Sequence, residues 1–225
     1  MTPEQALTAL KNAGTAENAK AQAAYHKNLR QHLGVRNPDI DQMARQWRAD
    51  LSMPDRLHLA DGLWQSNIHE ARVAAAKLLT QARIKTHESE AWALIASWTP
   101  EFDAWAIADH VSSAASRRLT AHPDRLDEVE EWTKSNHMWT RRAALVSTLP
   151  WGKQRHPSED EAAARERILG WAALYVDDKQ WFIQKAVAWW LRDLSKRAPD
   201  RVKTFLDQHG ENMKNFARKE AGKYL

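Results

Sequence analysis

Apolar residues recur at intervals of three and four along nearly the whole chain. This spacing gathers them on one face of an α-helix, whereas the alternation of apolar and polar residues that is typical of a half-buried strand is missing. Only seven residues are Gly, well below the average usage of about 7%. The pattern therefore predicts an all-α protein.

Proline residues support several of the expected helix boundaries, because the residue before a proline is biased out of the helical region. Connections of two to five residues predict that successive helices pack antiparallel. The helices are expected near residues 3–12, 16–33, 39–49, 54–65, 68–83, 88–98, 103–120, 125–134, 138–149, 159–176, 180–197, 199–208 and 212–224.

A repeat underlies this pattern. Trp64, Trp98 and Trp132 are 34 residues apart, and each lies at or near the end of an expected helix. Two helices per period of 34–43 residues indicate a curved helical solenoid, in which one layer of helices lines the concave surface. The segments IHEARVAAAKLL, FDAWAIADHVSS, MWTRRAALVSTL and WFIQKAVAWWLR are the long helices of that layer. We expect a single domain over residues 1–225; the alternative is an irregular helical bundle.

Composition excludes several classes of site. The chain has no Cys, so disulfides and thiolate metal sites are excluded and a reducing, cytoplasmic compartment is expected. Neither an apolar run of about 18 residues nor a leader peptide is found, so we expect no membrane association. The ten His form no HExxH pair and are expected to be surface or helix-capping residues. No glycine-rich phosphate loop occurs, so neither a metal nor a cofactor is expected.

Basic charge is concentrated at the C-terminal end. The chain has a net charge of +4, yet residues 181–225 hold ten basic and five acidic residues, which leaves residues 1–180 nearly neutral. This asymmetry favours a polyanionic partner, although a solvated helix face would produce the same pattern.

The segment 102–113 combines a large aromatic residue with a carboxylate. Trp105 and Asp109 are four residues apart, which on a helix brings their Cβ atoms to about 5–6 Å. The core stripe of this helix is expected to be Ala104, Ile107, Ala108, Val111 and Ala114. The other face would then carry Trp105, Asp109, Ser112, Ser113 and Ser116.

The helix expected at 180–197 has a face of opposite charge. Ile183, Val187, Trp190 and Leu194 form its core stripe, and Lys185, Trp189, Arg192 and Lys196 form another. Cations beside an indole suit nucleic acid, because they neutralise phosphates while the ring stacks. The alternative is that Trp189 only covers a neighbouring helix.

Weaker basic signals come from two other helices. Arg141 and Arg142 point about 100° apart, so at most one of them is expected to face a groove. The helix expected at 16–33 adds Tyr25, Lys27 and Arg30.

Several segments together resemble a known family. In order, AYHKNLRQHLGVRNP, LWQSNIHEARVAAAKLL, WTPEFDAWAIADHVSS, NHMWTRRAAL, FIQKAVAWWLRDLSKRAPDRV and ARKEAGKYL are similar to the blocks of the AlkD-type DNA alkylation-repair glycosylases. The resemblance covers residues 20–225 and is most specific at 182–199. It implies HEAT-like repeats that form a right-handed α-α superhelix.

The resemblance also implies a function and a site. The family excises positively charged alkylpurines, chiefly of the 3-methyladenine and 7-methylguanine type, from duplex DNA. Residues matching its catalytic group are Asp109, Trp105 and Trp189. Matches to its DNA-contacting residues are Tyr25, Arg142 and Arg192, and the basic stripes add Lys27, Lys185 and Lys196. We expect a monomer that binds duplex DNA containing alkylated bases.

The chemistry of the reaction agrees with these roles. An N-alkylated purine is a cationic leaving group, so its departure leaves positive charge on the sugar, which a nearby carboxylate stabilises. At about 4 Å and an effective dielectric constant near 20, this attraction is roughly 4 kcal/mol. Realised mainly in the transition state, it is worth about three orders of magnitude in rate.

One segment departs from the family pattern. Asn37 replaces a Thr, and Asp41 stands where an Arg is usual. We expect Asp41 to remove a phosphate contact and to add a repulsive charge. Two alternative functions therefore stay open: a catalytically silent DNA-binding HEAT-like module, and a protein-binding scaffold.

Overall fold

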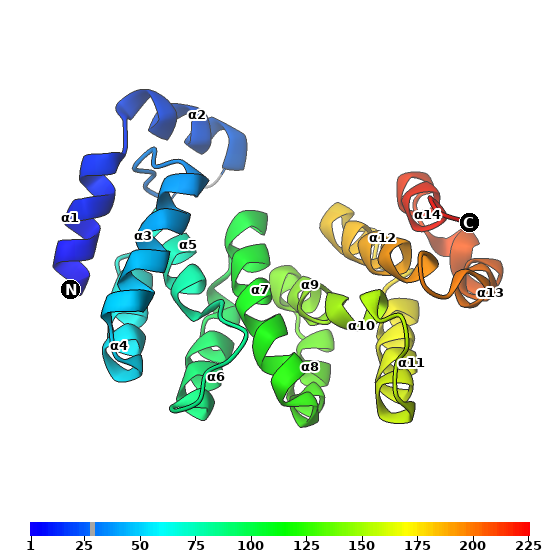
Figure 1. The fold of residues 1–225 in the computed structure, drawn as a ribbon. Coiled ribbons are helices and arrows are strands. Elements are labelled where there is room, and N and C mark those ends of the chain that lie inside the picture. Colours follow the sequence, from blue (N-terminus) through cyan, green and yellow to red (C-terminus); the bar gives the residue numbers. More distant parts are fainter. Residues whose placement is uncertain (28–29) are drawn as a thin grey trace. The chain divides into compact units, whose positions relative to one another are not determined.

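The computed structural model describes residues 1–27 and 30–225, and within them the regular secondary structure is helical (Figure 1). The α-helices are α1 (Pro3–Ala13), α2 (Ala16–His26), α3 (Asn37–Asp50), α4 (Met53–Gln65), α5 (His69–Leu79), α6 (Glu88–Ser97), α7 (Trp105–Ala121), α8 (Leu126–Thr133), α9 (Met138–Ser147), α10 (Leu149–Lys153), α11 (Glu159–Leu174), α12 (Trp181–Ser195), α13 (Pro199–His209) and α14 (Asn215–Ala221). Short 3₁₀ turns are η1 (Thr99–Glu101), η2 (Pro123–Arg125) and η3 (Gly210–Asn212). The prediction of an all-α protein is confirmed.

Several expected helices are shorter in the structure; the one expected at 212–224, for example, spans only Asn215–Ala221. The helix expected at 16–33 ends at His26, because Lys27 adopts a left-handed conformation with φ 53°; residues 28 and 29 of that range lie outside the described residues. The helix expected at 68–83 ends at Leu79. The helix expected at 138–149 ends at Ser147, and α10 begins beyond it, because Pro150 has no N–H with which to continue α9.

The chain forms two compact units, residues Met1–Ala121 and His122–Leu225. In the first unit, α5 packs against both α3 and α7 in one layer, while α4 and α6 pack against each other and back this layer (Figure 1). Helix α5 is buried over almost its whole length and is rich in Ala, which lets the neighbouring helices approach it closely. The helix that carries Trp105 and Asp109 therefore packs on a buried support.

The second unit repeats this plan. Helix α12 packs between α9 and α14 in one layer, and α8, α10 and α13 pack against that layer from behind. The predicted core stripe of α12 is fully buried: Ile183, Val187, Trp190 and Leu194. The long helices singled out in the sequence thus form the main layer of each unit, α5 and α7 in the first and α9 and α12 in the second.

The repeated tryptophans pack as the spacing suggests. Trp64 near the end of α4 and Trp98 at the end of α6 stack on each other, with ring centroids 4.5 Å apart and planes 8° apart. Trp132 is buried near the end of α8. Each of these tryptophans therefore lies at or near the C-terminal end of one helix in the supporting layer, α4, α6 or α8.

No helix within residues 1–27 and 30–225 combines the length and the apolar character that crossing a bilayer requires. The expectation of one domain over residues 1–225 stays a prediction.

Candidate functional site

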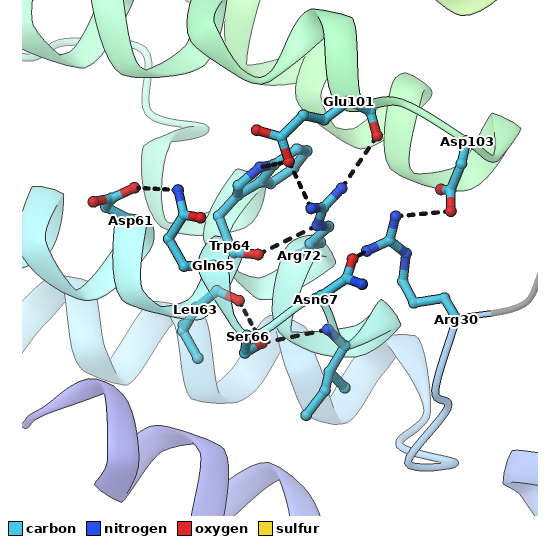
Figure 2. A network of polar contacts seen from close by, with 11 residues as sticks. Arg30, Asp61, Leu63, Trp64, Gln65, Ser66, Asn67, Arg72, Glu101 and Asp103 are labelled. Carbon is cyan, nitrogen blue, oxygen red and sulfur yellow. Dashed lines mark hydrogen bonds and ion pairs between the residues drawn. The ribbon is translucent and has the colours of Figure 1, made fainter.

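The start of α7 is fixed by two carboxylates (Figure 2). Glu101 accepts hydrogen bonds from the indole of Trp64, at 3.1 Å, and from Arg72, at 2.7 Å. The Arg72 guanidinium also lies 4.2 Å from the centroid of the Trp64 ring. Asp103 pairs with Arg30 at 2.7 Å. These contacts tie the residues just before α7 to α4, to α5 and to the segment after α2, and so position Trp105 and Asp109.

The two faces of α7 largely follow the prediction. The expected core residues are buried: Ala104, Ile107, Ala108, Val111 and Ala114. Trp105 and Asp109 are half-buried on the other face. Ser112 was expected on that second face as well, but it is buried. It lies one turn after Ala108 and therefore belongs to the core side.

Tyr25, Trp105 and Asp109 line one cavity of about 420 Å³ in the first unit. Tyr25, at the end of α2, is 68% exposed. Its ring meets that of Trp105 edge to face, with centroids 5.9 Å apart. The sequence therefore identified three residues that the fold brings together. The other lining residues are Gln22, His26, Val35, Asn37, Ile40, His69, Glu70, Val73, Ala106, His110 and Ser113.

Histidines that were expected at the surface or at helix caps are instead half-buried or buried at this cavity, which His26, His69 and His110 line. The rings of His26 and His32 each lie 4.4 Å from that of His69, centroid to centroid. Burial is the main cause that lowers the pKa of His69 to about 3 and that of His110 to about 4. Burial also lowers the pKa values of His26 and His32. Near pH 7 these rings are therefore neutral.

A buried carboxylate lies on the same wall. Glu70 of α5 is 1% exposed and accepts backbone hydrogen bonds from Leu33, at 2.9 Å, and Gly34, at 2.6 Å. Gly34 has φ +81°, and a Cβ there would lie 2.1 Å from the carbonyl oxygen of Thr15, so this turn requires glycine. Glu70 thus holds the loop that leads into α3.

The lining of the cavity has a consistent electrostatic character. Among the described residues that border it, none is Lys or Arg, whereas Asp109 and Glu70 supply carboxylates. Tyr25, Trp105 and the histidines add aromatic rings. Within residues 1–27 and 30–225, no three His, Cys, Asp or Glu side chains are arranged to hold a metal ion. Such a lining suits a planar cation and disfavours a phosphate.

The structure changes the interpretation of Asp41. Its carboxylate pairs with Lys77 of α5 at 2.6 Å. The negative charge that was expected to repel DNA is therefore compensated in the free protein. Asn37, the other departure from the family pattern, lines the cavity.

In the second unit, Trp189 is in contact with two cations. The Arg142 guanidinium lies 5.0 Å and the Lys185 ammonium 5.3 Å from its ring centroid. Arg142 is 1% exposed and donates a hydrogen bond to the carbonyl of Phe182 at 2.7 Å. Arg141 instead pairs with Asp178 at 2.9 Å. Of these two arginines, only Arg142 lies beside Trp189, and it is buried there, whereas it was expected to face a groove and contact DNA.

The other basic residues that were predicted to contact DNA do not lie against the Trp189 ring. Arg192 pairs with Glu220 of α14 and with Asp193. The Lys196 ammonium lies 4.3 Å from the ring of Tyr224. Lys27 is exposed at the end of α2. Their contacts to DNA stay predictions.

Comparisons with known proteins agree with this description. The family model described as DNA alkylation repair enzyme matches residues 6–225. A solved structure titled as a predicted DNA alkylation repair enzyme from Enterococcus faecalis is 20% identical, with 94% of this chain and 96% of that chain covered and a TM-score of 0.76. AlkD2 from Streptococcus mutans is 22% identical, with 84% and 89% covered and a TM-score of 0.62. No curated protein matches. With its family model matched over nearly the whole length, and with the helical-repeat fold of those structures, the chain belongs to the DNA alkylation repair enzyme family.

Proposed function

We propose that this protein is a monofunctional DNA glycosylase, which excises positively charged N-alkylated purines of the 3-methyladenine and 7-methylguanine type from duplex DNA. It hydrolyses the N-glycosidic bond and leaves an abasic site. The observation that carries this proposal is the cavity around Asp109, which presents carboxylates and aromatic rings in a chain whose net charge is +4.

Asp109 is the central residue of the proposed reaction. A carboxylate in a DNA-binding surface repels phosphate, so a protein that only binds DNA gains nothing from it. It becomes favourable when a cation forms beside it. As the bond from C1′ to the purine nitrogen breaks, the bonding electrons leave with the base, which becomes neutral, and the sugar becomes oxocarbenium-like. Water then adds to C1′ and releases a proton. The base needs no protonation, because it already carries the charge.

The two tryptophans have supporting roles in this proposal. Trp105 offers an aromatic edge and face beside Asp109, held by Tyr25 and the start of α7. Trp189 offers a second ring, together with Arg142 and Lys185. The more exposed cations of the second unit, such as Lys185, neutralise backbone phosphates, whereas the buried Arg142 supports the Trp189 ring. The rings attract the cationic nucleotide.

The direct test is base release from methylated duplex DNA by the purified protein under single-turnover conditions. The wild type is expected to release 7-methylguanine and 3-methyladenine. Asp109→Asn keeps the shape of the side chain and removes its charge. It should lower the rate of 7-methylguanine release by about two to three orders of magnitude, the part of the Coulomb attraction that is specific to the transition state.

A binding titration on undamaged duplex separates the alternatives. Asp109→Asn should bind it equally well or slightly more tightly, because a repulsive charge is gone. Equal rates of base release for the two proteins would refute the catalytic role of Asp109. Weaker binding by the variant would indicate a structural role. If the wild type binds DNA but releases no base, the chain is a silent DNA-binding module.

A further inference from the structure

An exposed aromatic pair lies in the second unit, outside the residues assigned to base excision. Trp181, the first residue of α12, is 46% exposed. Phe216 of α14 stacks on it, with centroids 5.6 Å apart and planes 27° apart. Phe182 meets Trp181 edge to face at 4.9 Å. The neighbouring rings hold Trp181 in place, so that it presents a supported aromatic surface to the solvent.

A cation lies directly on this surface. The Lys185 ammonium is 4.4 Å from the centroid of the Trp181 ring. Trp181, Lys185 and Trp189 are four residues apart in turn and therefore share one face of α12. They border a cavity of about 370 Å³, which Ala188, Phe216 and Glu220 also line. The Glu220 carboxylate is paired with Arg192, so its charge is compensated.

The combination of a flat ring and an adjacent ammonium matches a nucleotide. The ring offers a face to a base, and the ammonium offers a positive charge to the phosphate next to it. Within a continuous duplex, however, both faces of each base are covered by its neighbours. Only a base that has left the stack can lie on Trp181. The surplus of basic residues in 181–225 favours such an anionic partner over a protein.

We propose that Trp181, Phe216 and Lys185 form a binding site for one unpaired nucleotide of the DNA. The base stacks on the face of Trp181 that the Lys185 ammonium now covers. The ammonium moves from the ring to the phosphate of the same nucleotide, which is a favourable exchange because a cation–π contact at an exposed ring is weak. The proposal rests on the proposed function only in taking DNA as the partner. It adds that the protein prefers DNA whose stacking is already broken.

The test compares two undamaged probes of equal length, a continuous duplex and the same duplex with one unpaired nucleotide. Binding of the full chain is followed by fluorescence anisotropy of the labelled DNA. The wild type should bind the second probe more tightly. Trp181→Ala should weaken binding of that probe by about 5- to 100-fold, the range found for loss of a stacking residue. Its affinity for the continuous duplex should stay within about twofold.

Two further variants test the site: one changes its supporting ring, and the other is a control outside it. Phe216→Leu removes the supporting ring and should weaken binding of the unpaired probe in the same direction, but less. Leu174→Ala removes another exposed apolar side chain of the same unit, 73% exposed at the end of α11, and should change neither affinity. Far-UV circular dichroism checks that each variant is folded.

Equal affinity of the wild type for the two probes would overturn the proposal. So would an equal loss on both probes in Trp181→Ala, which would assign the ring to duplex binding, or no loss at all, which would leave the surface to a protein partner. The result is independent of base excision. A wild type that releases no base from methylated DNA, but binds the unpaired probe through Trp181, would refute the proposed function and keep this site.

Discussion

The two units use the same arrangement but differ in the charge of the groups that it contains. In each unit, a buried polar side chain near the start of a central helix holds neighbouring backbone segments. In the first unit this is Glu70 of α5, whose carboxylate accepts hydrogen bonds from Leu33 and Gly34. In the second it is Gln184 of α12, which donates to the carbonyls of Val176 and Asp178 at 2.9 Å. One unit thereby buries a carboxylate beside its cavity, and the other buries a neutral amide.

The tryptophans differ in the same way. Trp105 contacts the uncharged rings of Tyr25 and His26. Trp189 contacts Arg142 and Lys185, so its π electrons already face cations of the protein. Under the proposed function, the first unit would accommodate the developing cation and the second would contact the DNA backbone. The following predictions are ordered from the largest expected effect to the smallest.

The largest effect is expected from the buried carboxylate. Glu70→Gln can keep the oxygen that accepts from Leu33 and Gly34, but it replaces the second oxygen by an NH₂ group that faces the N–H of Leu33. The variant should lower the free energy of unfolding by about 2–4 kcal/mol, because a charge-assisted acceptor is lost and a buried donor is left unsatisfied. Urea unfolding measures this. Glu90→Gln, at an exposed position paired with His87, is the control and should change stability little. If the Glu70→Gln variant is as stable as the wild type, the carboxylate does not hold the loop.

Acid should destabilise the protein through the first unit. The pKa values of His69 and His110 are lowered to about 3 and about 4 in the folded chain, while the ordinary value is 6.5. Below pH 6.5 the unfolded chain therefore binds protons that the folded chain does not, and the free energy of unfolding decreases as the pH is lowered. The expected loss is about 1 kcal/mol per histidine between pH 6.5 and 5.5.

Urea unfolding at pH 7.5, 6.5 and 5.5 checks this prediction. His69→Gln should reduce the loss of stability between pH 6.5 and 5.5 by about 1 kcal/mol, although it also changes the packing of the ring stack. Equal stability at pH 7.5 and 5.5 would contradict the neutral, buried state of the histidines.

Loss of the Trp189 ring should affect excision less than loss of the Asp109 charge. A ring contributes about 0.5–2 kcal/mol toward a cation, so Trp189→Ala should lower single-turnover release of 7-methylguanine by about 2- to 30-fold. Trp189→Phe should restore part of the rate. Leu174→Ala serves as the control for a lost apolar side chain. A loss as large as that of Asp109→Asn would show that the second unit also stabilises the transition state.

The smallest effect concerns salt. If Arg192 neutralises a phosphate, Arg192→Ala should make the log–log dependence of DNA affinity on salt shallower by about 0.9. Arg201 of α13 is the matched control, because it is also ion-paired, with Glu166 at 2.8 Å, but lies on a helix of the other layer. Arg201→Ala should leave the slope unchanged. An unchanged slope for Arg192→Ala would place Arg192 in a purely structural pair with Glu220.

The sequence by itself determined the all-α class, most helix positions and the faces of α7 and α12. These features depend on local spacing: apolar residues at three and four place Ile107 and Val111 on one side of a helix whatever surrounds it. The resemblance to the family added Trp105, Asp109 and Trp189 as site residues. The sequence also singled out Tyr25, but not the contact it makes.

Only the tertiary structure decided which side chains meet. The histidine group joins residues of α2, of α5 and of the loop between α2 and α3, and no local pattern relates His26 to His69. The pairing of Asp41 with Lys77 crosses from α3 to α5, so its charge could not be judged from the segment alone. Trp181 was overlooked although it lies one turn before Lys185, because its exposure and its contact with Phe216 depend on how α14 packs against α12. Partners distant in the chain are set by packing, and packing also determines which charges are compensated.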